Sequence, residues 1–186
     1  MSFKIPNERI GVLIGKSGSV KEKIESLTNT EITIDSKSGS VYVKKKDDSG
    51  MMIGDWVAKN IIKAISRGFN PKIAVKLMGE EYLLEIIDIQ NVLGNSRKKI
   101  YRIKSRLIGE SGKSKRTIES LANVHLSIYH DTVSIIGQYE GLKVAREAVF
   151  RLLRGQSHSS VYRFLQKKHD ELKRKSITEI WKPDKF

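Results

Sequence analysis

The sequence contains no cysteine, which excludes disulfide bonds, thiol nucleophiles and cysteine-ligated zinc sites. Its four histidines do not form the closely spaced pair with a carboxylate that a zinc hydrolase helix requires. No run of about 18 apolar residues could span a bilayer, and the N-terminal residues show no apolar stretch of signal-peptide length. We therefore expect no metal, no cofactor and no membrane helix, and a cytoplasmic protein.

Motifs for catalysis and nucleotide hydrolysis are also missing. The carboxylates do not cluster: Glu80 and Glu81, for example, lead into a predicted strand without a partner that spacing identifies. The string Gly15-Lys16-Ser17 looks like the end of a nucleotide-binding P-loop, but the first glycine of that motif belongs at Ile10, and in a second copy at Leu107. We therefore expect a protein without enzymatic activity.

Negative charge is scarce relative to positive charge. The chain has 35 Lys and Arg against 21 Asp and Glu, a net charge of +14. An excess of that size attracts polyanions, and Lys and Arg side chains displace counterions when they meet phosphates. A solubilising surface is the alternative, and heat-adapted proteins are also rich in charge. Stability networks need both signs, however, so the imbalance favours a nucleic-acid partner.

An internal repeat is the most informative feature that the chain does have. Residues 13–29 read LIGKSGSVKEKIESLTN and residues 107–123 read LIGESGKSKRTIESLAN, 94 positions apart. Each copy is a Gly-x-x-Gly loop followed by an amphipathic helix. Such repetition in a chain of 186 residues predicts two similar small domains.

The apolar patterns around both copies predict one order of elements: strand, helix, loop, helix, strand, strand, helix. In the first unit these elements fall at residues 3–6, 9–14, 15–18, 20–29, 31–35, 41–45 and 53–65. In the second unit they fall at residues 82–89, 96–107, 109–112, 114–121, 126–129, 133–136 and 142–153. Asn70-Pro71 and the apolar segment up to Gly79 predict a tight connector, so we expect the units to pack together. A basic helix is predicted from residue 159 to about 175, followed by a polar tail.

The two loops indicate binding to a nucleic-acid backbone. Glycines at both ends let backbone N–H groups approach phosphates without a Cβ in the way, and the following helix adds the positive end of its dipole. The KH module clamps about four single-stranded nucleotides in this way. One Gly-x-x-Gly string is weak evidence, but its recurrence in matched surroundings is strong.

Candidate RNA-binding residues follow from this interpretation. The loops contribute Gly15, Lys16, Ser17, Gly18, Gly109, Glu110, Ser111 and Gly112. Nearby cations are Lys21, Lys113, Lys115 and Arg116, together with Arg102 and Arg106 of the basic segment 95–106. Isoleucines at matched positions would form an apolar floor for the bases: Ile14, Ile24, Ile34, Ile108, Ile118 and Ile128.

Several of these residues have an alternative role. Ile24, Ile118 and the strand isoleucines fit ordinary core positions, and Lys21 and Lys115 fit a solvated helix face. Glu110 should weaken phosphate binding locally unless neighbouring cations offset it. For the basic residues after position 160, RNA contact, a partner surface and solubility remain equal alternatives.

The second half of the chain also resembles a known family. The features that carry the resemblance are Gly112 followed by Lys115 and Ile118-Glu119, the strand ending Ile136-Gly137, the run LKVAR at 142–146, and Gly155 followed by Ser160-Val161-Tyr162. They resemble the second KH domain of small-subunit ribosome assembly factors of the partner-of-Nob-one family, in their archaeal form. The resemblance is strong after residue 80 and more generic before it. It implies a non-catalytic tandem KH protein that binds single-stranded rRNA near the 3′ end of the small-subunit precursor, beside a PIN-domain endonuclease.

The sequence thus predicts an α/β (α+β) fold of two tandem type I KH domains, each a three-stranded sheet covered by helices. We expect the first domain at 1–78, the second at 79–156, and a basic C-terminal helix and tail at 157–186. The predicted function is single-stranded RNA binding on the 16S rRNA precursor of the small ribosomal subunit. The alternative is a KH-fold adaptor for proteins with nonspecific nucleic-acid affinity.

Overall fold

The computed structural model of the chain describes residues 2–46 and 53–180. The predicted polar tail, residues 181–186, lies outside them. The first unit contains β1 (Ser2–Lys4), α1 (Asn7–Ile14), the 3-10 turn η1 (Lys16–Gly18), α2 (Ser19–Thr28), β2 (Thr30–Asp35), β3 (Ser40–Lys45) and α3 (Gly54–Ser66). Its antiparallel sheet has the order β1-β3-β2. Along the chain, the elements follow one another in the predicted order.

The second unit repeats the arrangement. It contains β4 (Tyr82–Asp88), α5 (Ile89–Leu93), α6 (Arg97–Ile108), η3 (Glu110–Gly112), α7 (Lys113–Ala122), β5 (Val124–Tyr129), β6 (Thr132–Gln138) and α8 (Tyr139–Leu153). Its antiparallel sheet, β4-β6-β5, has the same topology as the first. The predicted fold of two three-stranded sheets with helices is therefore confirmed.

Two short helical segments were not predicted from the sequence. The connector is helical, with α4 (Pro71–Ala74) and η2 (Val75–Met78), and the Asn70 side chain caps α4 by accepting from Lys72 N at 2.9 Å. The helix α5 was not predicted at all. It begins where the Asp88 carboxylate accepts hydrogen bonds from the backbone of Gln90 and Asn91.

A repeated glutamate explains part of the sequence repeat. Glu25 in α2 accepts a hydrogen bond from Ile32 N of β2 at 2.6 Å, and Glu119 in α7 accepts one from Leu126 N of β5 at 2.8 Å. Each carboxylate therefore fixes its helix to the strand that follows. The shared Ile-Glu-Ser-Leu run has a structural role, independent of any ligand.

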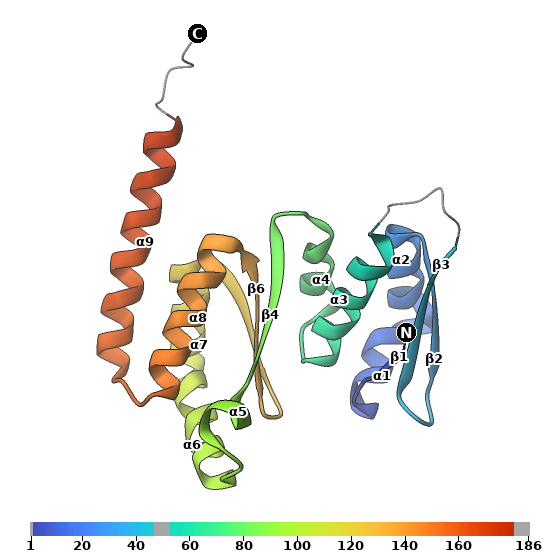
Figure 1. Ribbon diagram of the computed structural model, residues 1–186, viewed down its shortest axis with the longest axis horizontal. Helices are drawn as coiled ribbons and strands as arrows, with labels where there is room; N and C mark the ends of the chain where they lie inside the picture. The colour runs from blue at the N-terminus through green and yellow to red at the C-terminus, as the bar shows by residue number, and fades with distance from the viewer. Residues whose placement is uncertain (1, 47–52, 181–186) are drawn as a thin grey trace.

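The second sheet is covered on both faces, because the first unit packs against it. Ile136 of β6 is fully buried in the same cluster as Ile61 of α3 and Leu77 of η2. Figure 1 shows β4 and β6 between α3 and α4 on one side and α7 and α8 on the other. Ser127 Oγ also donates to the carbonyl of Arg67 at 2.7 Å. The predicted packing of the two units is confirmed.

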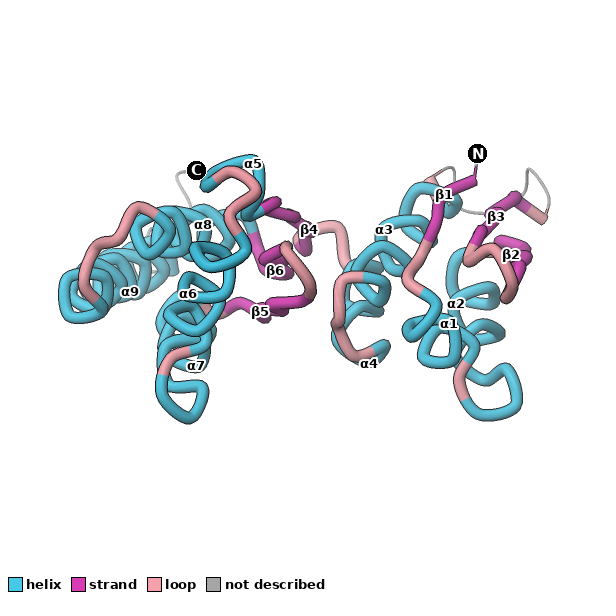
Figure 2. The backbone as a smooth tube through the Cα atoms, turned by 90° about the horizontal axis from the view of Figure 1, so that it is seen from below, coloured by secondary structure: helices cyan, strands magenta, loops and turns pink. Residues whose placement is uncertain are grey.

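The first sheet, in contrast, has an open face. Burial alternates along β2, where Ile32 is buried and Glu31 and Thr33 are exposed. Figure 2 places this sheet at the end of the molecule away from α9. The alternation that the sequence shows for this hairpin therefore matches a sheet with one solvated face.

The C-terminal helix α9 (His158–Ile180) packs against α7 and α8. Val161 and Leu165 are fully buried in the core of the second unit. The Arg151 guanidinium of α8 lies 3.9 Å from the centre of the Phe164 ring. The first half of this helix is therefore held by the second unit as part of its hydrophobic core.

Candidate nucleic-acid interface

Each Gly-x-x-Gly loop is a tight turn between two helices, and the two loops have nearly the same backbone. Gly15 has φ 74° and ψ 179°, and Gly109 has φ 73° and ψ 173°. Ser17 and Ser111 both lie in the left-handed region, with φ 51° and 48°. The repeat in sequence is therefore a repeat in conformation. Both loops project to the same side of the molecule, at its two ends (Figure 2).

The first glycine of each loop is required by local packing. A Cβ on Gly15 would lie 2.5 Å from Val20 Cγ2 and 2.9 Å from Val20 N. A Cβ on Gly109 would lie 2.7 Å from the backbone nitrogen of Ser114. The extended backbone with positive φ is also essentially restricted to glycine. A Cβ on Gly18 would meet only the flexible Glu22 side chain, so the two glycines of a loop have different roles.

The loops present unpaired backbone donors. Within the described part of the chain, no backbone acceptor takes the N–H groups of Lys16, Ser17, Glu110 and Ser111. The last glycine closes each turn, because Gly112 N donates to the Gly109 carbonyl at 3.1 Å. Unpaired N–H groups at the start of a helix attract anions through their partial positive charge and the helix dipole. Each loop can therefore hold a phosphate.

The predicted groove isoleucines fall into two groups. Ile14, Ile34 and Ile128 are half-buried, and Ile108 is 40% exposed, so their side chains are available to a ligand. Ile24 and Ile118 are at most 1% exposed and belong to the hydrophobic cores. The expectation that Ile24 and Ile118 form part of a base-binding floor is therefore wrong, and the alternative core role is correct for both.

The predicted cations also differ in their surroundings. Lys16, Lys113, Arg102 and Arg116 are exposed. Lys21 and Lys115 each lie one helical turn from the anchoring glutamate of their own helix, at 3.7 Å from Glu25 and 3.9 Å from Glu119. These two ion pairs sit at matched positions. The glutamates of these pairs are only 14% and 25% exposed, whereas the lysines are 36% and 39% exposed, so each ammonium group is partly open to solvent.

Arg106 has a structural partner. Its Nη2 donates to the Gln156 carbonyl at 2.5 Å, and His158 Nε2 lies 2.8 Å from the Arg106 carbonyl oxygen. These contacts fix the last turn of α6 to the connection between α8 and α9. Contact of Arg106 with RNA stays a prediction, and it would require this guanidinium to be shared or released.

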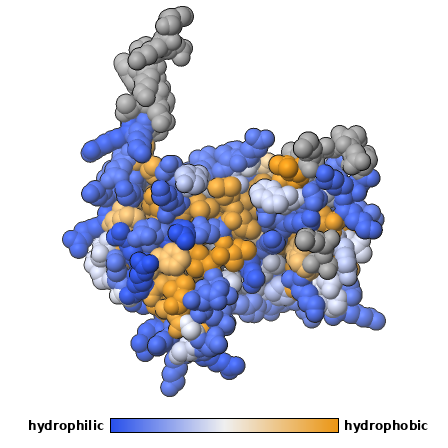
Figure 3. Space-filling view, viewed as in Figure 1, coloured by the Kyte–Doolittle hydropathy of each residue, from blue (hydrophilic) through white to orange (hydrophobic). Residues whose placement is uncertain are grey.

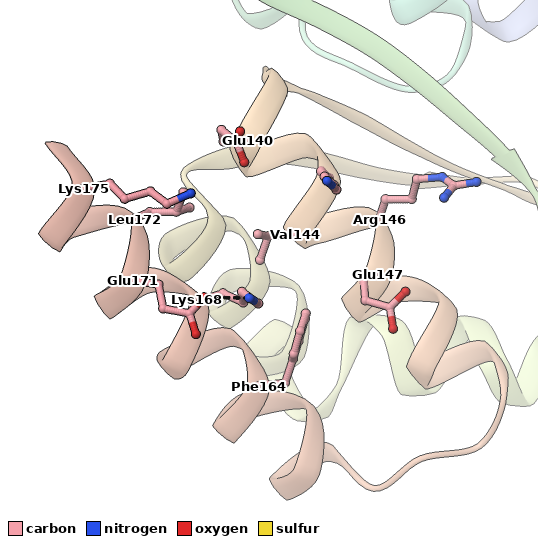
Figure 4. A pocket seen from close by; sticks show the side chains of 10 residues that line it. Glu140, Val144, Arg146, Glu147, Phe164, Lys168, Glu171, Leu172 and Lys175 are labelled. Carbon is pink, nitrogen blue, oxygen red and sulfur yellow. Dashed lines mark hydrogen bonds and ion pairs between the residues drawn. The ribbon is translucent and has the colours of Figure 1, made fainter. Parts of the chain in front are cut away.

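The groove between α8 and α9 has mixed charge. Its wall carries three acidic and four basic side chains around Val144, Phe164 and Leu172: Glu140, Glu147, Glu171, Lys143, Arg146, Lys168 and Lys175. Figure 4 shows these residues, with Lys168 Nζ bonded to Glu171 Oε2 at 2.6 Å. The hydrogen bond from Lys168 holds the pKa of the Glu171 carboxyl below its usual range. Such a surface does not favour a polyanion, in contrast to the loops.

The two units differ at the helix before the loop. Helix α1 has 8 residues and α6 has 12. The longer α6 carries Tyr101, which is 75% exposed. Sequence reasoning missed Tyr101, although it lies seven residues, or two helical turns, before Ile108 and so on the same helix face.

The described residues offer neither a metal site nor a membrane-spanning helix. No group of three or more His, Cys, Asp or Glu side chains there could hold a metal ion. None of the helices in these ranges is long and apolar enough to cross a membrane.

The fold and loops together define a tandem KH protein of type I. Comparison with known families agrees: residues 83–170 match the "Eukaryotic type KH-domain (KH-domain type I)" and residues 1–54 match the "KH domain". The KH domain-containing protein MJ0443 of Methanocaldococcus jannaschii is 45% identical over 97% of this chain and 78% of its own length. The RNA-binding protein pno1 of Dictyostelium discoideum is 24% identical over 85% of this chain and 66% of its own length.

A solved structure extends the comparison. In the a/eIF2alpha-aDim2p-rRNA complex from Pyrococcus horikoshii OT3, the matched chain is 37% identical, with a TM-score of 0.87, covering 92% of this chain and 94% of that one. The chain therefore belongs to the PNO1/Dim2 family of KH-domain proteins, in its archaeal form.

Proposed function

We propose that this protein binds single-stranded RNA through its two Gly-x-x-Gly loops and acts without catalysis in ribosome biogenesis. The observation that carries the proposal is the duplicated loop, whose unpaired N–H groups stand at the start of an amphipathic helix beside an accessible isoleucine. The loop donors hold the backbone, and the isoleucines contact the bases. Relatives support this reading, since one is named an RNA-binding protein and another is solved with rRNA.

The more specific part of the proposal is the target. We infer that the RNA is the 3′ end region of the 16S rRNA precursor on the pre-small ribosomal subunit, as the family resemblance implies. A PIN-domain endonuclease that trims this end is the corresponding protein partner, and the cytoplasm the corresponding location. The loops supply affinity for any single strand, while the grooves supply the preference among sequences.

The test measures RNA affinity of loop variants. The probe is a fluorescein-labelled single strand with the 3′ end sequence of the 16S precursor, compared with a shuffled RNA and with the matching DNA at fixed salt. Lys16→Asp with Ser17→Asp alters the first loop, and Glu110→Asp with Ser111→Asp alters the second. Carboxylates at a phosphate-binding loop repel the RNA backbone. The variant of the loop that contributes more to RNA affinity should therefore bind about tenfold more weakly, or weaker still.

Matched controls separate the loop effect from net charge. Gln138→Asp with Lys143→Asp lowers the net charge by three, as the first variant does, and Gln138→Asp alone lowers it by one, as the second does. Both positions are exposed and lie outside the loops: Gln138 is beside the C-terminal end of α7, and Lys143 is in the groove between α8 and α9. If the controls weaken binding as much as the loop variants, or all strands bind equally in every variant, specific KH binding is wrong.

A protein-adaptor role is the second candidate. Apolar side chains are exposed around the junction of the two units: Trp56 is 56%, Ile53 49% and Leu83 37% exposed. Figure 3 shows apolar surface gathered over the middle of the molecule. The Pyrococcus complex also contains a/eIF2alpha, which makes that protein a partner to test. Loss of its binding in Trp56→Ser, with RNA affinity unchanged, would support this role.

A further inference from the structure

A pocket of about 550 Å³ lies along the N-terminal half of α6 in the second unit. Tyr101, Arg97 and Lys104 line it from α6, and Asp131 lines it from the turn between β5 and β6. Gln90, Asn95 and Ile100 complete the wall. An exposed aromatic ring, two cations and a carboxylate thus meet in one concave site that no role in the fold explains.

The pocket lies on the same helix, α6, that leads into the loop that we propose to hold the RNA backbone. Arg97, Tyr101, Lys104 and Ile108 follow one another at spacings of four, three and four residues, which places them on one face of α6. Ile108 directly precedes the loop. At 1.5 Å per residue, Tyr101 lies about 10 Å along the helix from Ile108. A single strand held at the loop can therefore reach Tyr101.

The Asp131 carboxylate is held in place for recognition. Its Oδ2 accepts a hydrogen bond from Gln90 Nε2 at 2.8 Å, and its carbonyl accepts one from Ile89 N at 2.8 Å. Within the described part of the chain Oδ1 makes no hydrogen bond, so it can accept one from a ligand. A carboxylate accepts from the amino group of a base, which cytosine, adenine and guanine have and uracil lacks.

We propose, on the basis of the RNA-binding function above, that this pocket is a base-selective subsite of the second KH domain. Tyr101 stacks on the base, Arg97 and Lys104 bind the adjoining phosphates, and Asp131 accepts a hydrogen bond from the exocyclic amino group. The subsite selects a base with an amino group against uracil. The first unit has no counterpart, because the position 94 residues before Tyr101 is Asn7, at the beginning of the shorter α1. The second domain therefore contributes more of the sequence preference.

The first test compares tyrosine variants of the full chain on the fluorescein-labelled 16S 3′-end RNA. Stacking on an aromatic ring predicts that Tyr101→Ala weakens binding about tenfold, while Tyr101→Phe stays within about twofold because the ring remains. Tyr139→Ala is the matched control, since Tyr139 is 61% exposed and lies outside the pocket. Thermal unfolding confirms that each variant folds, as expected for side chains this exposed.

The second test measures how the affinity depends on the base at each position of the RNA. Each position of the RNA is replaced in turn by uracil, and binding is measured for the wild type and for Asp131→Asn. Uracil at one position should lower the affinity of the wild type several-fold. The same replacement should lower the affinity of Asp131→Asn much less, because an asparagine amide both donates and accepts hydrogen bonds.

The outcomes separate this subsite from the general function. If Tyr101→Ala binds as the wild type while the Glu110→Asp/Ser111→Asp loop variant loses affinity, the subsite is wrong and RNA binding through the loop stands. If Tyr101→Ala and both loop variants, Lys16→Asp/Ser17→Asp included, all bind as the wild type does, both proposals are wrong. Equal loss in Tyr101→Ala and Tyr139→Ala also overturns the subsite, and so does uracil tolerance at every position in the wild type.

Discussion

Single residues at the loops show how strictly local packing constrains the sequence. The first glycine of each loop combines a backbone conformation restricted to glycine with a Cβ position already occupied by the next helix. The second glycine is left-handed, and a Cβ there would meet only the end of a flexible side chain, Glu22 at Gly18 and Arg116 at Gly112. The pattern Gly-x-x-Gly therefore contains one glycine that the fold requires and one that is less constrained.

This difference predicts unequal costs of substitution. Gly15→Ala should lower the free energy of unfolding by about 3 kcal/mol or more, because Val20 must move and the backbone is strained. Gly18→Ala should cost about 1 kcal/mol, the penalty for a left-handed alanine. Urea unfolding of both variants checks this. Equal costs would contradict the steric account.

The isoleucines mark a limit of sequence reasoning at this scale. Ile14 and Ile24 have the same side chain and both fit a helical apolar stripe, yet one is half-buried and the other fully buried. Periodicity identifies the apolar face of a helix, but not which residues at its edge stay accessible once the sheet is in place. Tyr101 was missed for a related reason, since a single exposed aromatic residue on a basic helix gives no periodic signal.

Among the elements, α9 is the one whose role changes most between sequence and structure. Its basic composition suggested a separate extension, but Val161 and Leu165 complete the core of the second unit. Deletion of residues 157–186 would therefore expose that core as well as remove a candidate docking helix. Point variants on the exposed side of α9 test a partner role better, for example Arg163→Glu with Lys167→Glu.

A stability measurement tests the packing of α9. Leu165→Ala should lower the free energy of unfolding by about 2–5 kcal/mol, as expected for a leucine removed from a full core. Gln166→Ala, at the next and exposed position, should change it by less than about 0.5 kcal/mol. A Leu165→Ala chain as stable as the wild type would show that α9 does not belong to the core.

Helix α5 was missed for a different reason. Its five residues, Ile89–Leu93, are too short for a helical period, and only the Asp88 cap could have indicated its start. The longer helices and the alternating strands were predicted to within a few residues, because each buries one regular face. Short elements depend on contacts that lie far apart in the sequence, as between Ile89 N and the Asp131 carbonyl.

For the whole molecule, the sequence predicted that the two units pack together, but it did not specify which residues meet between them. The run TVSIIG of β6 is buried on both faces, including Ser134, because α3 and η2 of the first unit cover the sheet. Glu8 of α1 accepts a hydrogen bond from the Tyr129 hydroxyl and lies 2.8 Å from His130 Nε2. The Arg9 guanidinium lies 5.7 Å from the centre of the same tyrosine ring.

This contact predicts a pH dependence of stability. The hydrogen bonds from Tyr129 and then His130 hold the pKa of the Glu8 carboxyl below its usual 4.5, so its contribution is present above that pH and lost as pH falls further. Burial, together with the bond to Glu8, raises the pKa of Tyr129 from 10.0 to about 12, so its contribution is present below pH 10 and lost between pH 10 and 12.

Two variants test the acid and the alkaline loss of stability separately. In urea unfolding from pH 3 to 12, Glu8→Gln should remove part of the wild-type loss of stability on the acid side. Tyr129→Phe should remove part of the loss between pH 10 and 12. Profiles parallel to the wild type in both variants would show that this contact between the units does not form in solution.

The central claim is that the backbone of both loops meets RNA, and amide resonances of the ¹⁵N-labelled chain test it most directly. Titration with the single-stranded 16S 3′-end RNA should shift the amide signals of Lys16, Ser17, Glu110 and Ser111. For comparison, amides on the open face of the first sheet should shift less. The same RNA annealed into a duplex should shift them far less. Shifts confined to α9, with all four loop amides unmoved by the single strand, would contradict the account.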